Sequence, residues 1–311
     1  MRFSVVVTTW SDAREALLHR NLAALAAQTA APYETIVVVD HNPRLQARLA
    51  GAWPAVDVIA SGPVRGAAGA RNAGTARATG DAVAFLDDDA RPAATWLEEL
   101  AAAYAHEDVA GVGGTLRPGW PAARPWWFPE EFDWVVGCTY RGLPTRRAPV
   151  RNLIGANMSF RRDLLLGVGG ERDGFGRVGL APVACEETEL CIRIRASRPR
   201  LQLLFEPAAE AVHHVTPERA RVRYFLRRCY AEGRGKARLR RLVGAAEGLS
   251  AERSYVGRTL PLGVLHGIRT AMSTGDPRSL GRAGMIVAGL ASAGAGYVAE
   301  RAAPRSGRAP A

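Results

Sequence analysis

Short apolar runs rich in β-branched residues recur through the first 116 residues and alternate with helical patterns. Continuous runs of this length are typical of strands that are buried on both faces of a parallel sheet. The linking segments are short, as in folds where each strand is followed by a helix. The predicted strands cover residues 3–9, 35–39, 56–59 and 82–86, with a further strand from Val109.

The segments between these strands carry helix signals. Asp12 and Glu15 have the spacing of a capping box, and Leu18, Leu22 and Leu25 then mark one helical face. Further helices are expected after the glycine-rich turn of residues 66–79 and over Ala94–Tyr104. The alternation predicts an α/β fold with a mostly parallel, doubly wound, Rossmann-like sheet.

The pattern changes after residue 116. Residues 118–134 hold several prolines and four tryptophans and are predicted to form a long irregular loop. A strand at NMSF and a helix from about Glu186 follow, and the chain becomes basic and helical beyond residue 217. The expected organisation is an α/β domain over 1–217 (halves 1–116 and 117–217), a basic helical extension over 218–301 and a disordered tail over 302–311.

Composition agrees with a globular protein and indicates an anionic partner. Of the 311 residues 48% are hydrophobic, and the formal net charge is +11. Residues 219–241 hold ten Arg or Lys and one acid, which suits an anionic membrane surface or an ordinary solvated helix. No RNA-binding, zinc or helix-turn-helix signature accompanies the basic segment, so no nucleic-acid partner is expected.

The remaining features point to the cytoplasm. The four cysteines form no CxxC pair and are expected to be reduced thiols. The first residues lack the long apolar segment of a signal peptide. Residues 283–299 are rich in Gly and Ala and are interpreted as a core or interfacial helix that is slightly short for a membrane span.

Candidate chemistry gathers where the predicted strands end. Thr8 and Thr9 end the first strand, Asp40 follows the second, and an aspartate triplet begins at Asp87 after the fourth. Ligands of open α/β sheets bind at the carboxyl ends of the strands, so these side chains are expected to converge. Asp40 suits a base N–H or a ribose hydroxyl, although a turn aspartate explains it equally well.

The triplet Asp87, Asp88 and Asp89 is the strongest single signal. In an extended backbone Asp87 and Asp89 share a face, and Asp88 points the other way. Crowded carboxylates repel one another unless a cation offsets them, and oxygen ligands suit Mn²⁺ or Mg²⁺. His213 or His214 is a candidate to complete the metal site.

Two further segments carry candidate site residues. The segment from Gly66 to Gly74 opens a helix with small residues, and Arg71 within it would add charge for a phosphate. Glu186 and Glu187 begin a later helix. Glu187 falls on its inward stripe, where a carboxylate is costly without a function, so it is the candidate catalytic base.

In this order the pieces resemble the family two glycosyltransferases, which have a GT-A fold. The quoted segments are VVVTTW, VVVD, GAAGARNAG, FLDDDARP, NLIGANMSFRR, EETELCIR and AVHHV, over roughly residues 3–215. The stretches WWFPEEFDWVVGCTY and YFLRRCYAEG are similar to a bacterial subgroup related to glucosyl-dolichyl phosphate glucuronosyltransferases. The resemblance implies an inverting transfer of sugar from a nucleotide diphosphate donor, usually UDP-linked, in cell-envelope or natural-product assembly.

The resemblance also implies roles for individual residues. Thr9 and Asp40 would line the nucleobase site, Arg71 would contact the nucleotide, and Thr8 and Asp88 are further candidates for the donor site. Asp87 would lie near the ribose, Asp89 would bind the metal under the diphosphate, and Asn157 would lie near the donor sugar or acceptor. Glu187 or Glu186 would be the base. The chain departs from the family pattern in four places. Thr8 replaces the usual proline, Ser11 the usual asparagine, and Cys185 a common glycine, while the acidic pair is Glu-Glu instead of Glu-Asp.

Several alternatives stay open at this point. A sugar nucleotidyltransferase usually has a glycine-rich basic loop after its first strand, which TTWSDAR lacks. A basic membrane- or nucleic-acid-binding protein would use the arginine segment alone. As a secondary role, residues 219–241 could dock on anionic lipid beside a lipid-linked acceptor. Trp126, Trp127 and Trp134 are interpreted as an acceptor-side lid, or as the core beneath the loop.

Overall fold

The computed structural model describes residues 1–172, 185–244 and 250–303 and divides the chain into two compact units. Unit 1 comprises Met1–Arg117, Pro144–Ala181 and Glu186–His213, and unit 2 comprises Pro118–Leu143, Pro182–Cys185 and His214–Ala311. The tryptophan-rich segment is thus grouped with the C-terminal helices, whereas the sequence analysis placed it within 117–217. The predicted tail over 302–311 lies largely outside the described residues.

Nine strands of the described chain form one sheet in the order β3-β2-β1-β4-β8-β6-β9-β5, with β7 paired to β9. The first four strands in this order run parallel, as predicted, whereas β8 is antiparallel to both β4 and β6. The expectation of a mostly parallel sheet therefore holds for only half of it. The strands are β1 (Phe3–Thr9), β2 (Glu34–Val39), β3 (Asp57–Ala60), β4 (Ala82–Asp87), β5 (Ala90–Pro92), β6 (Val109–Gly119), β7 (Ala148–Val150), β8 (Asn157–Arg161) and β9 (Gln202–His214).

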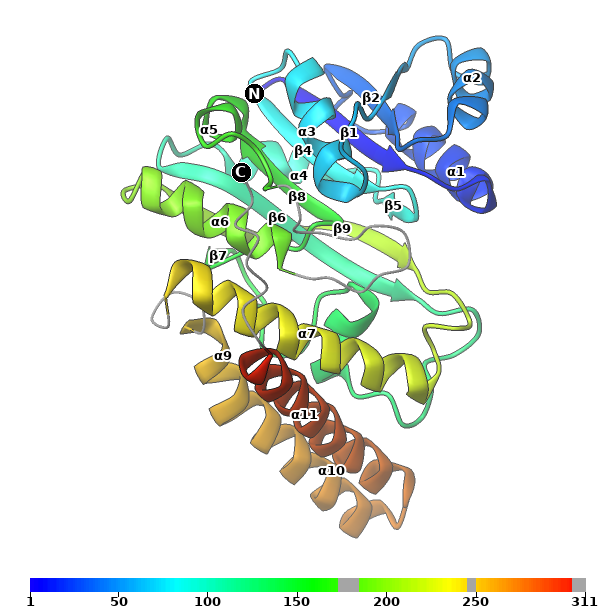
Figure 1. Ribbon diagram of the computed structural model, residues 1–311. Helices are drawn as coiled ribbons and strands as arrows, with labels where there is room; N and C mark the ends of the chain where they lie inside the picture. The colour runs from blue at the N-terminus through cyan, green and yellow to red at the C-terminus, as the bar shows by residue number, and fades with distance from the viewer. Residues whose placement is uncertain (173–184, 245–249, 304–311) are drawn as a thin grey trace. The chain divides into compact units, whose positions relative to one another are not determined.

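The helices of unit 1 alternate with its strands (Figure 1). Helix α1 follows a short 3-10 turn whose N-cap Ser11 accepts a hydrogen bond from the backbone N–H of Ala13, so the cap lies one residue before the predicted Asp12. The helices of unit 1 are α1 (Glu15–Ala26), α2 (Pro43–Ala52), α3 (Ala67–Arg77), α4 (Trp96–Ala103), α5 (Arg162–Gly167) and α6 (Glu186–Ser197).

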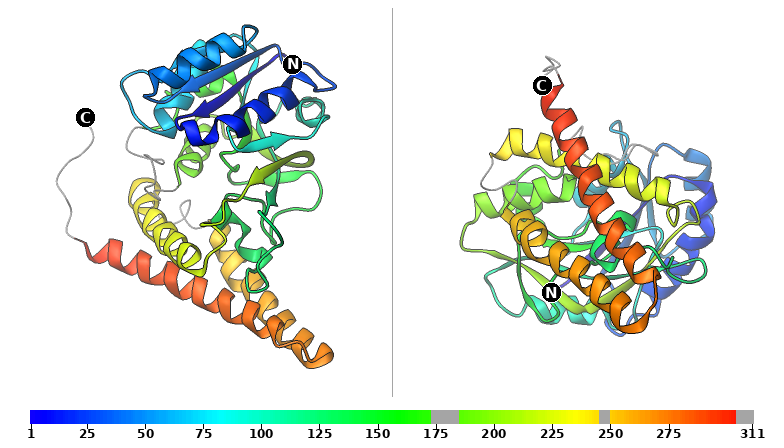
Figure 2. Two further views of the ribbon diagram at one scale, coloured as in Figure 1. Left: turned by 90° about the vertical axis from the view of Figure 1, so that its right-hand side faces the viewer. Right: turned by 90° about the horizontal axis from the view of Figure 1, so that it is seen from below.

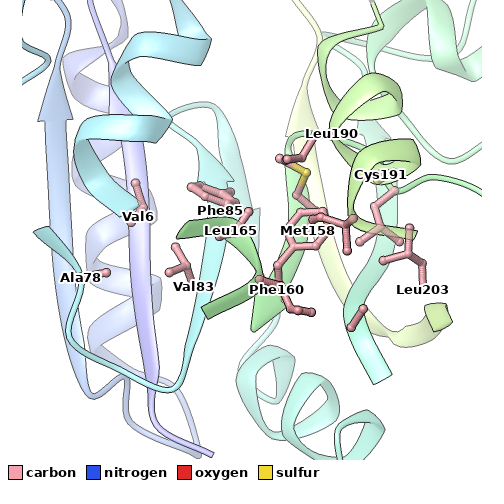
Figure 3. Packing of buried hydrophobic residues seen from close by; sticks show 14 of the residues in the cluster. Val6, Ala78, Val83, Phe85, Met158, Phe160, Leu165, Leu190, Cys191 and Leu203 are labelled. Atoms are coloured by element: carbon pink, nitrogen blue, oxygen red, sulfur yellow. The ribbon is translucent and has the colours of Figure 1, made fainter. Parts of the chain in front are cut away.

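The core of unit 1 lies between the sheet and its helices. Val6, Phe85, Met158 and Phe160 come from three neighbouring strands, and Leu190 of α6 packs against the same cluster (Figure 3). Helix α3 approaches this sheet closely, because a Cβ on its Gly74 would lie 2.4 Å from Val6. The small residues of α3 are therefore explained in part by packing, which fixes the start of α3 beside the strand ends.

Unit 2 is built from an aromatic segment and a set of long helices. Within it Phe128, Phe132 and Phe225 pack with their ring centroids 5.2–5.3 Å apart. Helix α11 packs against both α7 and α10. The helical elements of unit 2 are η2 (Glu130–Val136), α7 (Val222–Val243), α9 (Ser250–Ser254), η3 (Tyr255–Thr259), α10 (Leu260–Thr274) and α11 (Arg278–Ala302).

Helix α11 is longer than the apolar segment suggested. It covers 25 residues and, by length and composition, qualifies as a candidate membrane span, with 28% of its apolar window buried. A helix this exposed is not the core helix that one of the two sequence interpretations offered.

Candidate functional site

The aspartate triplet lies at the carboxyl end of β4, where the sequence analysis placed it. Asp87 is in register with Thr8 of β1, and the chain turns at Asp88 and Asp89 before entering β5. Ligand atoms of Asp87, Asp89 and His213 lie within 4.8 Å of one another. Two carboxylates and one imidazole at this separation form a donor set that fits a divalent cation such as Mn²⁺.

Strand pairing brings His213 to the triplet across 124 residues of sequence. Strand β9 is antiparallel to β5, with His213 opposite Ala90, and the His213 Nε2 atom lies 3.1 Å from a carboxylate oxygen of Asp89. His213 and Asp89 are both buried. His214, the other candidate, is half-buried, falls in unit 2 and is not a member of this three-residue group.

Asp88 is not a member of the three-residue candidate metal group, and it lies in a turn, not in the extended backbone that the sequence analysis assumed. It accepts hydrogen bonds from the Thr9 hydroxyl at 2.7 Å and from Arg14 at 2.7 Å. Burial raises the pKa of Asp88 to about 6, even though Arg14 opposes the shift. Thr9 and Asp88 are thus hydrogen-bonded to each other at the ends of neighbouring strands. The sequence analysis had assigned both residues to the donor site.

Arg14 is a residue that the sequence analysis missed. Its guanidinium lies 2.7 Å from Asp88 and 3.2 Å from Asp89. Burial opposes its charge, but Asp89 and Asp88 outweigh burial and raise the pKa of Arg14 above its ordinary value. A signal did exist in the sequence, because an arginine just before the first turn of α1 is disfavoured by the helix dipole unless another partner holds it.

Arg71 is almost fully buried and joins the triplet to a second missed residue, Glu171. Its guanidinium lies 3.3 Å from Asp87 and 3.1 Å from Glu171. Burial opposes the charge of Arg71, but Glu171 and Asp87 raise its pKa, and Glu186 and Glu187 add to the effect. Arg71 is thus the cation around which four carboxylates gather. No periodicity or motif of the sequence marked Glu171 as one of them.

Glu186 and Glu187 occupy the first turn of α6, as predicted. Glu186 is buried and Glu187 is half-buried, although the helical stripe had placed Glu187 as the inward residue. Almost every turn of α6 is buried, so the stripe could not separate the two. Cys185, which stands where glycine is common, has a φ of 84°, a backbone conformation that favours glycine.

Asp40 makes polar contacts at the carboxyl end of β2. It accepts hydrogen bonds from the backbone N–H of Gly66 at 2.9 Å and from the Ser61 hydroxyl at 3.0 Å, and His41 Nδ1 lies 2.7 Å away. Gly66 has a φ of 101° and is the N-cap of α3. Asp40 therefore fixes the glycine-rich turn that leads to Arg71, whatever else it binds.

Asn157 is fully buried and ties together strands of the sheet. Its amide accepts a hydrogen bond from Trp96 Nε1 at 2.8 Å and donates to the carbonyls of Thr115 and Ala209 at 3.1 and 2.9 Å. These three bonds give Asn157 a structural role. Its contact with a donor or acceptor stays a prediction.

Two of the three tryptophans are half-buried and pack within unit 2. Trp127 packs edge-on against Phe225 at 5.8 Å between ring centroids, and Trp134 donates a hydrogen bond to the Tyr255 hydroxyl at 3.0 Å. These contacts match the alternative of a second core. Trp126 is 55% exposed and lies over Gly281 of α11.

Comparison with known proteins bears on this arrangement. The family model described as Glycosyl transferase family 2 matches residues 4–168. A glucosyl-dolichyl phosphate glucuronosyltransferase of Haloferax volcanii is 35% identical over 240 residues, which cover 76% of each chain.

Two solved structures share the fold. A mannosyltransferase from Pyrobaculum calidifontis in complex with GDP-Man and Mn²⁺ has a TM-score of 0.57 at 18% identity and covers 94% of this chain and 86% of its own. GalNAc-T7 with UDP, GalNAc and Mn²⁺ has a TM-score of 0.54 at 16% identity, and the match covers 81% of this chain and 54% of GalNAc-T7. At these identities the likeness establishes the GT-A fold.

Proposed function

Because the chain belongs to glycosyl transferase family 2 and is a glycosyltransferase, we propose that it uses a divalent cation to transfer a sugar from a nucleoside diphosphate donor, with inversion at the anomeric carbon. A UDP-sugar is the proposed donor class, and the acceptor is a hydroxyl or a phosphate. The observation that carries this proposal is the convergence of Asp87, Asp89 and His213 at the carboxyl end of β4.

The proposed metal ligands are Asp89, Asp87 and His213. When bound, Mn²⁺ or Mg²⁺ would neutralise charge on the diphosphate leaving group. Arg14 and Arg71 orient the neighbouring carboxylates through the ion pairs described above. Thr8, Thr9, Asp40 and Asp88 stay proposed donor-site residues, because all four lie at the ends of β1, β2 and β4.

The proposed base is Glu187 or Glu186. A base must take the proton of the acceptor group as that group attacks the anomeric carbon. Glu187 is the more accessible of the two, which suits a group that must meet an acceptor from solution. The positive charge of Arg71 interacts electrostatically with both carboxylates.

A lipid-linked acceptor is supported by the relative from Haloferax volcanii, whose name includes a dolichyl phosphate glucoside. An enzyme with such an acceptor would work at the cytoplasmic face of a membrane. The candidate membrane helix α11 is compatible with that location.

The test is a screen of UDP-, GDP- and dTDP-sugars for hydrolysis in Mn²⁺, which reports the donor class without an acceptor. We expect release of one nucleoside diphosphate from its sugar donor, and loss of that release in Asp89→Asn. Release of pyrophosphate from a nucleoside triphosphate and a sugar phosphate, without any turnover of NDP-sugars, would instead identify a nucleotidyltransferase.

A further inference from the structure

Large apolar side chains cover the outward face of the hairpin formed by α10 and α11, which lie side by side in both views of Figure 2. Met272 of α10 is 82% exposed, and Val287 and Val298 of α11 are 57% and 66% exposed. Residues 283–299 contain no charged side chain. A surface helix of a soluble protein normally directs charged residues outward, so this face is suited to an apolar partner.

Small residues of α11 lie where this helix packs against α7. A Cβ on Gly233 of α7 would lie 1.8 Å from the carbonyl oxygen of Ala293, and one on Gly296 would lie 2.0 Å from that of Tyr230. The backbones of α7 and α11 therefore touch. Small residues inside and large apolar residues outside reverse the usual arrangement, so burial within unit 2 does not account for the large residues.

Helix α11 is fixed along α7 by polar contacts. Glu300 accepts hydrogen bonds from Arg234 and Arg238 at 2.7 Å each, and the Ser292 hydroxyl donates to the carbonyl of Leu226 at 2.8 Å. If α11 crossed a bilayer alone, it would lose these hydrogen bonds to α7. The contacts favour α11 lying along the surface of unit 2, with one face outward, although its length would permit a span.

The charges of the hairpin are basic and placed beside the apolar face. Residues 260–302 include Arg269, Arg278, Arg282 and Arg301, with Asp276 and the buried Glu300 as the acidic residues. All four arginines are exposed. Arginine at the border of an apolar face is the arrangement by which interfacial helices contact anionic lipid headgroups.

We propose that the α10–α11 hairpin docks unit 2 on an anionic lipid bilayer, with Met272, Leu280 and Val287 in the headgroup boundary and the arginines at lipid phosphates. This surface differs from the basic segment 219–241 that the sequence indicated. Many cations of that segment bind within unit 2, among them Arg228 with Glu232 and the arginines that hold Glu300. The docking does not depend on the proposed transfer reaction.

The test is flotation of the full chain with vesicles of phosphatidylcholine containing phosphatidylglycerol, compared with phosphatidylcholine alone. We expect binding to the anionic vesicles, and a loss of about tenfold or more in the double variant M272D/V287D, because charge is introduced into the buried face. The double variant R278Q/R282Q should lower the partition coefficient by about fivefold for each arginine removed.

A matched control is Leu166→Asp, which places the same charge at a 46% exposed leucine of α5 in unit 1. It should bind vesicles as the wild type does, and circular dichroism should show all variants folded. Equal vesicle binding by wild type and M272D/V287D would overturn the proposal. A second result would also overturn it: the wild type does not bind vesicles but sediments as a dimer, and M272D/V287D sediments as a monomer. A second copy of the chain would then cover this face.

Discussion

At the scale of single residues, one buried arginine organises the acidic groups of the candidate site. Arg71 is held between Asp87 and Glu171, and its charge reaches the two glutamates of α6. Carboxylates this crowded would repel one another if the cation were missing. The same arginine therefore offsets the charge of the acidic groups beside it and stabilises unit 1.

The variant Arg71→Met is expected to destabilise unit 1 by about 3 kcal/mol, because it leaves the buried Glu171 and Asp87 without their shared cation. Urea unfolding followed by circular dichroism measures the change. Arg2→Met is the control, since it breaks an exposed pair with Asp81 and should leave the midpoint almost unchanged. Equal midpoints for Arg71→Met and wild type would contradict this role.

Most residues of this network were predicted from the sequence. The sequence indicated the triplet, Arg71 and His213, because each lies at the end of a predicted strand or in a segment that resembles the family. It did not indicate Arg14 and Glu171, because their partners lie 74 and 100 residues away along the chain, and only the folded sheet brings them together. Asn157 was noticed for its motif, but its hydrogen bonds to Trp96 and two strands were not predictable from spacing.

At the scale of elements, glycines decide how the helices of unit 2 pack. Gly296 of α11 meets the backbone of α7, whereas a Cβ on Gly294 of the same helix would touch nothing within 4 Å. We therefore expect Gly296→Ala to destabilise unit 2 by roughly 2 kcal/mol, as in overpacked cores. Gly294→Ala should instead stabilise α11 by about 0.5–1 kcal/mol, because alanine favours helix.

Thermal unfolding of the two glycine variants measures both effects. Opposite shifts of the midpoint are the expected pattern. Two shifts of the same sign and size would mean that α11 does not pack on α7 through Gly296.

Within α7, Glu232 lies between Arg228 and Lys236, each one helical turn away. Burial raises its pKa, but Lys236 and Arg228 outweigh burial and lower the pKa of Glu232 to about 2. Because the folded-state pKa lies below the ordinary value of 4.5, the stabilisation is present above pH 4.5 and is lost as the pH falls toward 2.

The expected contribution of Glu232 is roughly 2 kcal/mol at neutral pH. Glu232→Gln should be less stable by this amount at pH 7 and should show a smaller loss of stability than the wild type between pH 4.5 and pH 2. Chemical unfolding at several pH values measures the slope, with the exposed Glu107→Gln as the control. If the free energy of unfolding of Glu232→Gln fell with pH as steeply as that of the wild type, other groups would be responsible for the acid sensitivity.

Strands β1, β2 and β4 followed closely from hydrophobic periodicity, because each is a continuous apolar run between turn signals. Helix α2 and the three-residue strand β5 were not predicted. The second half of the sheet did not follow from periodicity. Strand β8 is antiparallel to β4 and β6, and β9 is antiparallel to β5, through residues far apart in sequence, and periodicity carries no information on direction. The grouping of the tryptophan-rich segment with unit 2 could not be predicted either, because its rings pack on α7 and η3, which lie much later in the chain.

At the scale of the whole molecule, the proposed donor residues all belong to unit 1, and the apolar hairpin belongs to unit 2. Hydrogen exchange can separate the two. UDP with Mn²⁺ should slow amide exchange around residues 87–92 and 66–72, whereas anionic vesicles should slow it in α10 and α11. Protection of the hairpin by the nucleotide, with none at the triplet, would place the donor site elsewhere.

The central claim is that Asp89 and its neighbours hold a divalent cation that binds the diphosphate of the donor. Calorimetric titration of UDP, GDP and dTDP, each with and without Mn²⁺, tests it most directly on wild type, Asp89→Asn and the exposed control Asp81→Asn. We predict that Mn²⁺ tightens one nucleotide by about tenfold or more in wild type and Asp81→Asn, and that Asp89→Asn loses this gain. Equal nucleotide affinity with and without Mn²⁺ in the wild type would contradict the account.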